Sequence, residues 1–262
     1  MATTIVDGVE IAYDVTGSGP GLVLVHGITQ CRQMWDPLIG DLATDHTVVA
    51  IDMRGHGASG RAATYDNRVM AEDVAAVVAV EGLDAPLVVG HSMGGIVVTA
   101  YAATHPSRGV LNVDQSLALG DFQELVRAVE PMLRGDEFHT LVTSFIDSLQ
   151  GVLSDAEAER IAGLRQPVQE VVLGVWGPVL ELSLEELDGL VRSLTADVRV
   201  PYLALPHLDR RRRDDALQPR RVVRPRVAPV EGEVRHAHVG GQRADERIEL
   251  LERQLQHRSP HP

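Results

Sequence analysis

The chain has 262 residues, enough for one large domain or for a core domain that carries an insertion. With 44% hydrophobic and 23% charged residues, its composition is typical of a globular protein rather than a disordered or fibrous one. All 24 basic residues are arginine, which excludes a Walker-type phosphate loop, a kinase site and a Schiff-base enzyme, since each requires lysine. The single cysteine, Cys31, excludes disulfides within the chain and thiolate zinc clusters.

The formal charge of −13 is unevenly distributed. Residues 1–205 hold 28 acidic residues and 11 arginines (net −17), whereas residues 206–262 hold 9 acidic residues and 13 arginines (net +4). An acidic body repels polyphosphate, so nucleic acid is not an expected partner, and nucleic-acid or membrane binding by the arginine-rich end ranks last among the hypotheses. No run of 18 apolar residues occurs and the first residues lack a signal-peptide pattern, so a cytoplasmic protein with no membrane partner is expected.

The first half of the chain alternates between strand and helix patterns. Residues 9–15 alternate apolar with polar, which predicts an edge strand, and residues 21–25 form a continuous apolar run typical of a strand buried on both faces. Such alternation predicts parallel strand pairing with right-handed crossovers. Further strands are predicted at 47–51, 87–89 and 110–113, and helices at 34–42, 69–80 and 95–104.

After residue 117 the patterns become helical until a strand returns at 198–205. The simplest interpretation is a helical insertion between two strands of a parallel sheet, which divides the chain into a core (1–118), an insertion (119–196) and a second core part (197–262). The insertion's helices are predicted at 122–133, 138–149, 155–164 and 184–194.

One motif carries the chemistry: Gly90-His91-Ser92-Met93-Gly94 matches Gly-x-Ser-x-Gly between a predicted strand and a predicted helix. The serine of this motif occupies a strained turn that lifts its hydroxyl clear of the sheet, and the flanking glycines remove side chains that would collide there. Ser92 is therefore the candidate nucleophile.

A second segment, His26-Gly27-Ile28-Thr29, follows the strand at 21–25, at the end where catalytic loops of parallel sheets gather. Its backbone can supply one N–H to an oxyanion, from Ile28, with Met93 supplying the other. His26 and Gly27 are candidate substrate contacts. Asp52-Met-Arg-Gly-His-Gly-Ala-Ser59 follows the strand at 47–51 and is interpreted as a rigid turn that supports the same edge.

Together, His26-Gly27, Asp52-x-Arg54-Gly55-His56-Gly57-x-Ser59 and Gly90–Gly95 resemble the alpha/beta-hydrolase fold superfamily, and within it the esterase-like members with a helical lid. The resemblance covers residues 9–205 and implies an α/β fold, a mostly parallel sheet with helices on both faces and residues 119–196 as the lid. It also implies a serine, an acid and a histidine in that chain order. Members with an aspartate nucleophile, such as haloalkane dehalogenases and epoxide hydrolases, are disfavoured because position 92 is serine.

The acid and the histidine remain open. Family spacing places the acid just after the strand at 198–205, where Asp209 stands in the unusual context Pro206-His-Leu-Asp209-Arg-Arg-Arg-Arg213. Asp114, after the strand at 110–113, is a second candidate. The spacing allows His236 or His238 as the general base, in a segment whose prolines make a poor central strand. One hypothesis explains the change of net charge and the altered motifs after residue 205 together: the reading frame of the coding sequence is shifted near Leu205.

The main hypothesis is a serine hydrolase that cleaves a small carboxylic ester, thioester or lactone, with no cofactor, no metal and a small-molecule substrate as its partner. The alternative is a catalytically impaired or non-enzymatic ligand-binding member of the same fold. The sequence leaves the oligomeric state open. The predicted lid side chains lining an acyl pocket are Met132, Leu133, Phe138, Phe145 and Trp176.

Overall fold

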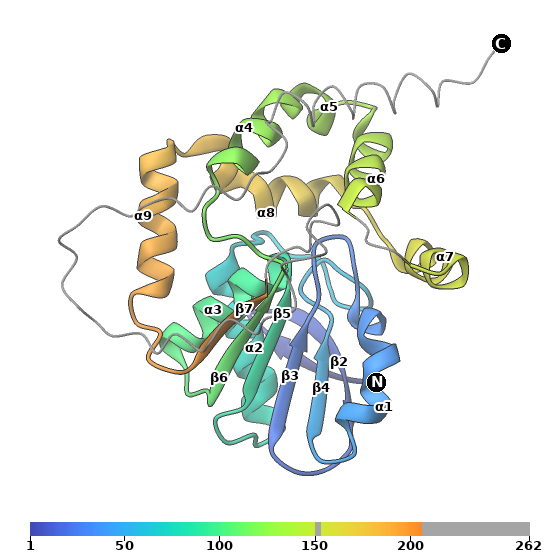
Figure 1. Cartoon of the computed structure of the whole chain (residues 1–262), viewed down its shortest axis with the longest axis vertical. Helices are drawn as coiled ribbons and strands as arrows, with labels where there is room; N and C mark the ends of the chain where they lie inside the picture. Colours follow the sequence, from blue (N-terminus) through green and yellow to red (C-terminus); the bar gives the residue numbers. More distant parts are fainter. Residues whose placement is uncertain (150–152, 206–262) are drawn as a thin grey trace, which may run out of the picture.

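A computed structural model describes residues 1–149 and 153–205, and a seven-stranded sheet forms its centre (Figure 1). The strands are β1 (Ala2–Val6), β2 (Val9–Thr16), β3 (Gly21–Val25), β4 (Thr47–Ile51), β5 (Leu87–His91), β6 (Gly109–Val113) and β7 (Tyr202–Leu205). Their order is β1-β2-β4-β3-β5-β6-β7; β1 and β2 pair antiparallel, β2 pairs antiparallel with β4, and all other pairs are parallel. The expected mostly parallel α/β sheet is confirmed.

The helices are η1 (Arg32–Trp35), α1 (Asp36–Leu42), α2 (Asn67–Val80), α3 (Met93–Thr104), α4 (Gly120–Ala128), α5 (Glu130–Arg134), α6 (Phe138–Leu149), α7 (Asp155–Leu164), α8 (Gln169–Glu181) and α9 (Leu184–Thr195). The first four cover the faces of the sheet, and α4–α8 lie over the end of the sheet where β5 leads into α3 (Figure 1). None of the described helices is long and apolar enough to cross a membrane.

Side-chain alternation along the central strands builds two cores, one on each face of the sheet. Val23 and Val25 of β3 belong to the larger cluster, which includes the buried faces of α2 and α3. Leu22 and Leu24 belong to the smaller cluster, against which Trp35 and the apolar side of α1 pack. A continuous apolar strand is therefore needed, because helices cover both of its faces.

Some elements differ from the sequence prediction in their pairing or bounds. Residues 9–16 are not the edge strand, because β1 pairs along the outer side of β2. The predicted helix 122–133 is two helices, α4 and α5, with Pro131 in the first turn of α5, where a missing N–H costs nothing. The last strand begins at Tyr202 rather than at 198.

The helix α8 lies in the part of the chain predicted to be helical, but its bounds were not predicted, and it contains Gly174, Gly177 and Pro178. It forms nevertheless because six of its apolar side chains are buried. Gly174 has a reason to lack a side chain: a Cβ there would stand 2.6 Å from Tyr65 Cδ2. Tyr65 thereby packs between the core and α8, and its hydroxyl donates to Glu170 Oε1 at 3.2 Å.

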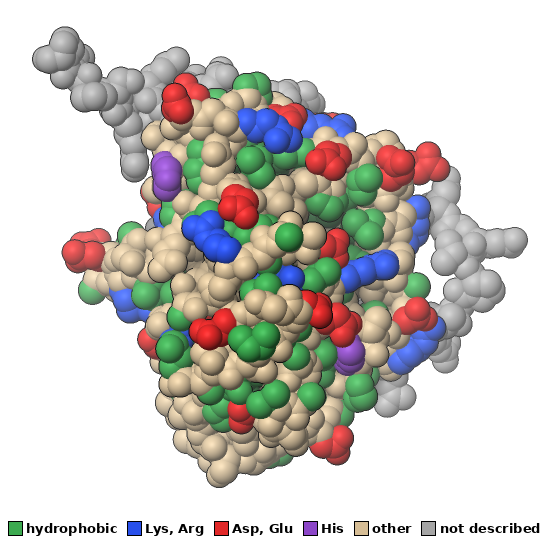
Figure 2. Space-filling view, turned by 180° about the vertical axis from the view of Figure 1, so that it is seen from behind, with side chains coloured by type: hydrophobic (Ala, Val, Ile, Leu, Met, Phe, Trp, Pro, Cys, Tyr) green, Lys and Arg blue, Asp and Glu red, His purple; other side chains and the backbone are tan. Residues whose placement is uncertain are grey.

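The described surface mixes charges of both signs. Figure 2 shows acidic, basic and apolar side chains interspersed on the face turned away from the viewer in Figure 1. Pairs such as Arg134–Glu130 and Arg160–Glu157 lie within single helices. Exposed pairs of this kind contribute little to stability.

Candidate active site

Ser92 occupies the turn between β5 and α3, which we call the elbow (Gly90–Gly94). Its backbone angles, φ +50° and ψ −123°, lie in a region that a side chain rarely adopts. The turn is tight, because a Cβ on Gly90 would stand 2.0 Å from Gly94 O and a Cβ on Gly94 would stand 2.4 Å from Val25 O. Both glycines are therefore sterically required, as the motif predicts.

The segment after β3, here called the β3 loop (residues 26–31), lies against the elbow. A Cβ on Gly27 would stand 3.2 Å from Ser92 Cβ and 3.1 Å from His91 Nδ1. The loop closes with the Gln30 N–H donating to Gly27 O at 3.2 Å, and Thr29 adopts φ +62°. The structure thus brings the two segments singled out in the sequence into direct contact.

Gln30 joins the β3 loop to the elbow. Its Oε1 accepts a hydrogen bond from the Gly27 N–H at 3.0 Å and lies 3.1 Å from His91 Nδ1. The Gly27 N–H therefore already donates a hydrogen bond within the protein. Among the described groups nothing accepts from the N–H of Ile28 or of Met93, and Met93 is the first residue of α3, so its N–H has no partner within the helix.

His26 is fully buried, and both of its ring nitrogens are engaged. Nδ1 lies 2.7 Å from Gly27 O, and Nε2 accepts from the Met53 N–H at 3.1 Å, so Nδ1 carries the hydrogen. Burial lowers the pKa of His26 to about 4, which keeps the ring neutral. These contacts fix the β3 loop to the Asp52–Ser59 turn, and the role of His26 as a substrate contact stays a prediction.

The Asp52–Ser59 turn is held by its own side chains. Asp52 is fully buried; its carboxylate accepts from Arg32 N at 2.6 Å and Ala58 N at 2.8 Å, and it also pairs with the Arg32 guanidinium. A Cβ on Gly57 would stand 2.2 Å from that carboxylate. Arg54 forms a buried bidentate pair with Asp73, at 2.7 and 2.6 Å. All these contacts are internal, in agreement with a supporting turn.

Asp114 comes directly after β6, in a left-handed conformation with φ +60°, and its N–H donates to Leu205 O at 2.7 Å. Strand register pairs Val113 with His91, and Ser92 N donates to Val113 O at 2.9 Å, so Asp114 directly follows the residue that accepts from the Ser92 N–H. Burial lowers the pKa of His91, and the charge of Asp114 opposes that shift. Asp114 is thus electrostatically coupled to the elbow.

The other triad candidates, Asp209, His236 and His238, lie outside the described residues, as does the segment for which a shifted reading frame was considered. No described histidine forms a hydrogen bond with the Ser92 hydroxyl. His56 is buried with Nδ1 3.0 Å from Arg54 O, and burial lowers its pKa to about 3. The described part of the chain also contains no group of three or more His, Cys, Asp or Glu residues arranged to hold a metal ion.

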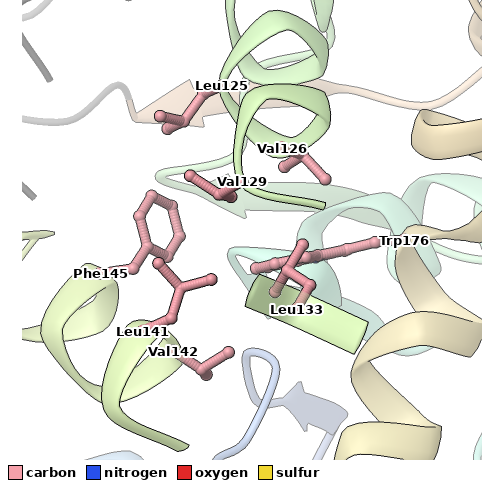
Figure 3. Close-up of a pocket in the computed structure, with 8 residues that line it drawn as sticks. All are labelled: Leu125, Val126, Val129, Leu133, Leu141, Val142, Phe145 and Trp176. Atoms are coloured by element: carbon pink, nitrogen blue, oxygen red, sulfur yellow. The ribbon is translucent and has the colours of Figure 1, made fainter. Parts of the chain in front are cut away.

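Trp176 lies in the helical insertion, formed by α4–α9, and is 7% exposed. Its ring meets those of Phe122 and Phe145 edge-on, with centroids 5.4 and 5.9 Å apart. A small apolar pocket opens beside it (Figure 3), with a free volume of about 10 Å³, close to what one water molecule needs. Its lining is Leu125, Val126, Val129, Leu133, Leu141, Val142, Phe145 and Trp176. The predicted lining residues Met132 and Phe138 are not among these.

Comparisons with known proteins agree with this geometry. Residues 20–135 match the family described as alpha/beta hydrolase fold. The chain is 35% identical over 228 residues to a 2-(acetamidomethylene)succinate hydrolase of Mesorhizobium japonicum, a match that covers 74% of this chain and 82% of that protein. It is 41% identical over 98 residues to a soluble epoxide hydrolase of Corynebacterium sp., covering 37% of this chain and about a third (34%) of that relative's length.

A solved structure, Est816, titled an N-acyl homoserine lactone degrading enzyme, is similar over 78% of this chain and 80% of its own, with 24% identity and a TM-score of 0.62. At that identity the likeness concerns the fold alone. The chain belongs to the alpha/beta hydrolase fold family, and the two relatives named above are hydrolases.

Proposed function

We propose that the protein is a serine hydrolase that cleaves a small carboxylic ester, thioester or lactone through an acyl-enzyme. The observation that carries the proposal is the strained Ser92 at the elbow, in contact with the β3 loop. Among the described groups, nothing accepts from the N–H of Ile28 in that loop or from the N–H of Met93 after the serine. A serine at this position favours acyl transfer, since its oxygen attacks a carbonyl carbon and the two N–H groups suit the oxyanion that results.

In the proposed reaction, Ser92 Oγ bonds to the carbonyl carbon while a general base takes the hydroxyl proton. The N–H groups of Ile28 and Met93 hold the oxyanion, each contributing about 3–4 kcal/mol to the transition state. The tetrahedral adduct collapses, and the alcohol or thiol departs with that proton; in a lactone the ring opens instead, and the protonated hydroxyl stays on the acyl chain. Water then attacks the acyl-enzyme, releases the carboxylic acid and restores the serine.

The general base is proposed to be His236 or His238, and its orienting acid Asp114 or Asp209. Of these, Asp114 is supported by its place beside the elbow and by its electrostatic coupling to His91. An acid at that point could orient an imidazole that reaches the Ser92 hydroxyl. The apolar pocket beside Trp176 is the proposed region for the acyl chain, and it would have to widen to accept more than a very small group.

The test is to incubate the full chain with a fluorophosphonate probe and to map the labelled residue by mass spectrometry. Label is expected at Ser92, and Ser92→Ala is expected to abolish both the label and the turnover of p-nitrophenyl acetate and butyrate, by about a millionfold if the serine acts as in protease triads. Ser18→Ala, which removes an exposed loop hydroxyl, is the matched control and retains both. A clean absence of label on the wild-type protein would contradict the proposal and support the non-enzymatic alternative.

A further inference from the structure

Arg165 lies in a short connection that packs on the β3 loop. The residue before it, Leu164, offers its carbonyl to Cys31 Sγ at 3.7 Å, and the residue after it, Gln166, donates its N–H to Thr29 O at 2.8 Å. Arg165 is therefore held between two contacts with the loop that borders Ser92. In Figure 1 this connection, between α7 and α8, passes beneath α6.

The guanidinium of Arg165 is buried but incompletely satisfied. Its side chain is 7% exposed, and Nη1 donates to Asp147 Oδ1 at 2.5 Å. Nε is buried and no described group accepts from it. A buried donor without a partner costs about 1–3 kcal/mol, and more when it is charged, so such a group needs a reason.

Two more buried hydroxyls on the neighbouring elements have no described partner. Thr29 Oγ1, on the β3 loop, belongs to a residue that is 1% exposed. Ser144 Oγ belongs to a residue that is 2% exposed and lies one turn before Asp147 on α6. The loop, the connection and α6 thus each contribute one unsatisfied polar atom.

The same helix links Arg165 to the apolar pocket. Leu141, Val142 and Phe145 of α6 line that pocket (Figure 3), while Asp147 of α6 binds Arg165. A cation paired with Asp147 of α6 and an apolar pocket lined in part by the same helix suit a ligand with an apolar chain and an anionic end. The net charge of −17 over residues 1–205 would otherwise repel an anion.

We propose that Arg165 binds a carboxylate on the acyl part of the substrate, so that the preferred substrates are esters, thioesters or lactones whose acyl chain carries a second, free carboxylate. This proposal rests on the proposed function and specifies its substrate class. The Nε side of a guanidinium matches a carboxylate in shape and charge, and Asp147 occupies Nη1 only among the described contacts. Burial strengthens such a contact because little water competes for it.

The experiment compares two p-nitrophenyl esters of the same acyl length, the hexanoate and the mono-ester of hexanedioic acid. The full-length wild-type protein is expected to hydrolyse the carboxylate-bearing ester with a kcat/KM about tenfold or more above that of the hexanoate. Arg165→Met is expected to lose about tenfold or more on the carboxylate-bearing ester, with a change below about threefold on the hexanoate. Arg160→Met is the matched control, because Arg160 pairs with Glu157 on α7, and it leaves the ratio of the two esters unchanged.

A second measurement does not depend on catalysis. Hexanoate and hexanedioate ions are added to Ser92→Ala protein, and the thermal midpoint is expected to rise with both ions, but not in the Ser92→Ala, Arg165→Met double variant. If fluorophosphonate labelling fails while this shift is present, the proposed function is wrong and the anion site stands. If labelling succeeds while wild type prefers the hexanoate, or the double variant keeps the shift, the anion site is wrong. If Arg165→Met does not fold, the test is whether hexanedioate inhibits the hydrolysis of p-nitrophenyl hexanoate by the wild-type protein. Inhibition is expected, and its absence overturns the proposal.

Discussion

Acid should destabilise this protein through two buried histidines. His26 and His56 lie against each other, with ring centroids 5.1 Å apart and exposed fractions of 0% and 2%. Burial lowers their pKa values to about 4 and about 3, from 6.5. In the unfolded chain both rings take up protons near pH 6.5, whereas in the folded protein they stay neutral.

Proton linkage gives the direction and the size of this pH effect on the free energy of unfolding. Between pH 6.5 and pH 4 the unfolded state binds more protons than the folded state, so the free energy of unfolding falls as the pH falls. Going from pH 7.5 to pH 5.5 should cost about 1 kcal/mol for each ring and about 2–3 kcal/mol for both. That is a large part of the 5–15 kcal/mol that keeps a typical domain folded.

The assay is urea unfolding at pH 7.5 and pH 5.5 of the wild-type protein and of His56→Asn. The variant is less stable than wild type at pH 7.5, because it loses the packing of a buried ring. At pH 5.5 the difference is expected to narrow by about 1 kcal/mol, since the variant has one proton fewer to take up on unfolding. A difference that stays the same at the two pH values would refute the reasoning, and would mean that His56 titrates alike in both states.

Three further predictions concern the loops that hold the site. Gly57→Ala should lower the free energy of unfolding by about 2 kcal/mol or more in urea titrations, because its Cβ meets the Asp52 carboxylate and φ is +53°. Asp73→Asn should cost about 3–5 kcal/mol by the same measurement, since it leaves the buried Arg54 charge uncompensated, and an unchanged midpoint would contradict this. Gln30→Leu should slow fluorophosphonate labelling about tenfold or more, because it loosens the β3 loop from the elbow. Gln30→Glu keeps both acceptor contacts of the side chain and should slow labelling less. Equal labelling rates in the two variants would contradict a positioning role for Gln30.

The elbow was predictable because its constraints are local. A serine that must adopt φ +50° between a strand and a helix needs small neighbours within two residues on each side, and that need is written into adjacent positions. The buried strands β3 and β4 were predictable for a similar reason, since a strand covered by helices on both faces must be apolar throughout. Family membership followed from these motifs and their order.

Other features depend on contacts between distant residues. The helix α8 forms because a buried interface outweighs two glycines and a proline, and one of those glycines is required by Tyr65, more than a hundred residues earlier. The hydrogen bond that the Gly27 N–H donates to Gln30 Oε1 depends on how the β3 loop folds, and among the described groups it leaves the Ile28 N–H as a donor without an acceptor.

The amino-acid order alone therefore determined the fold class, the elbow with its candidate nucleophile and the supporting turns, because each is specified by short-range sterics and by periodic burial. Only the tertiary structure decided that both ring nitrogens of His26 are held by backbone groups and that a buried arginine from the insertion lies in a connection packed on the β3 loop. Those facts come from elements that meet after the chain has folded, and no spacing between neighbouring residues encodes them.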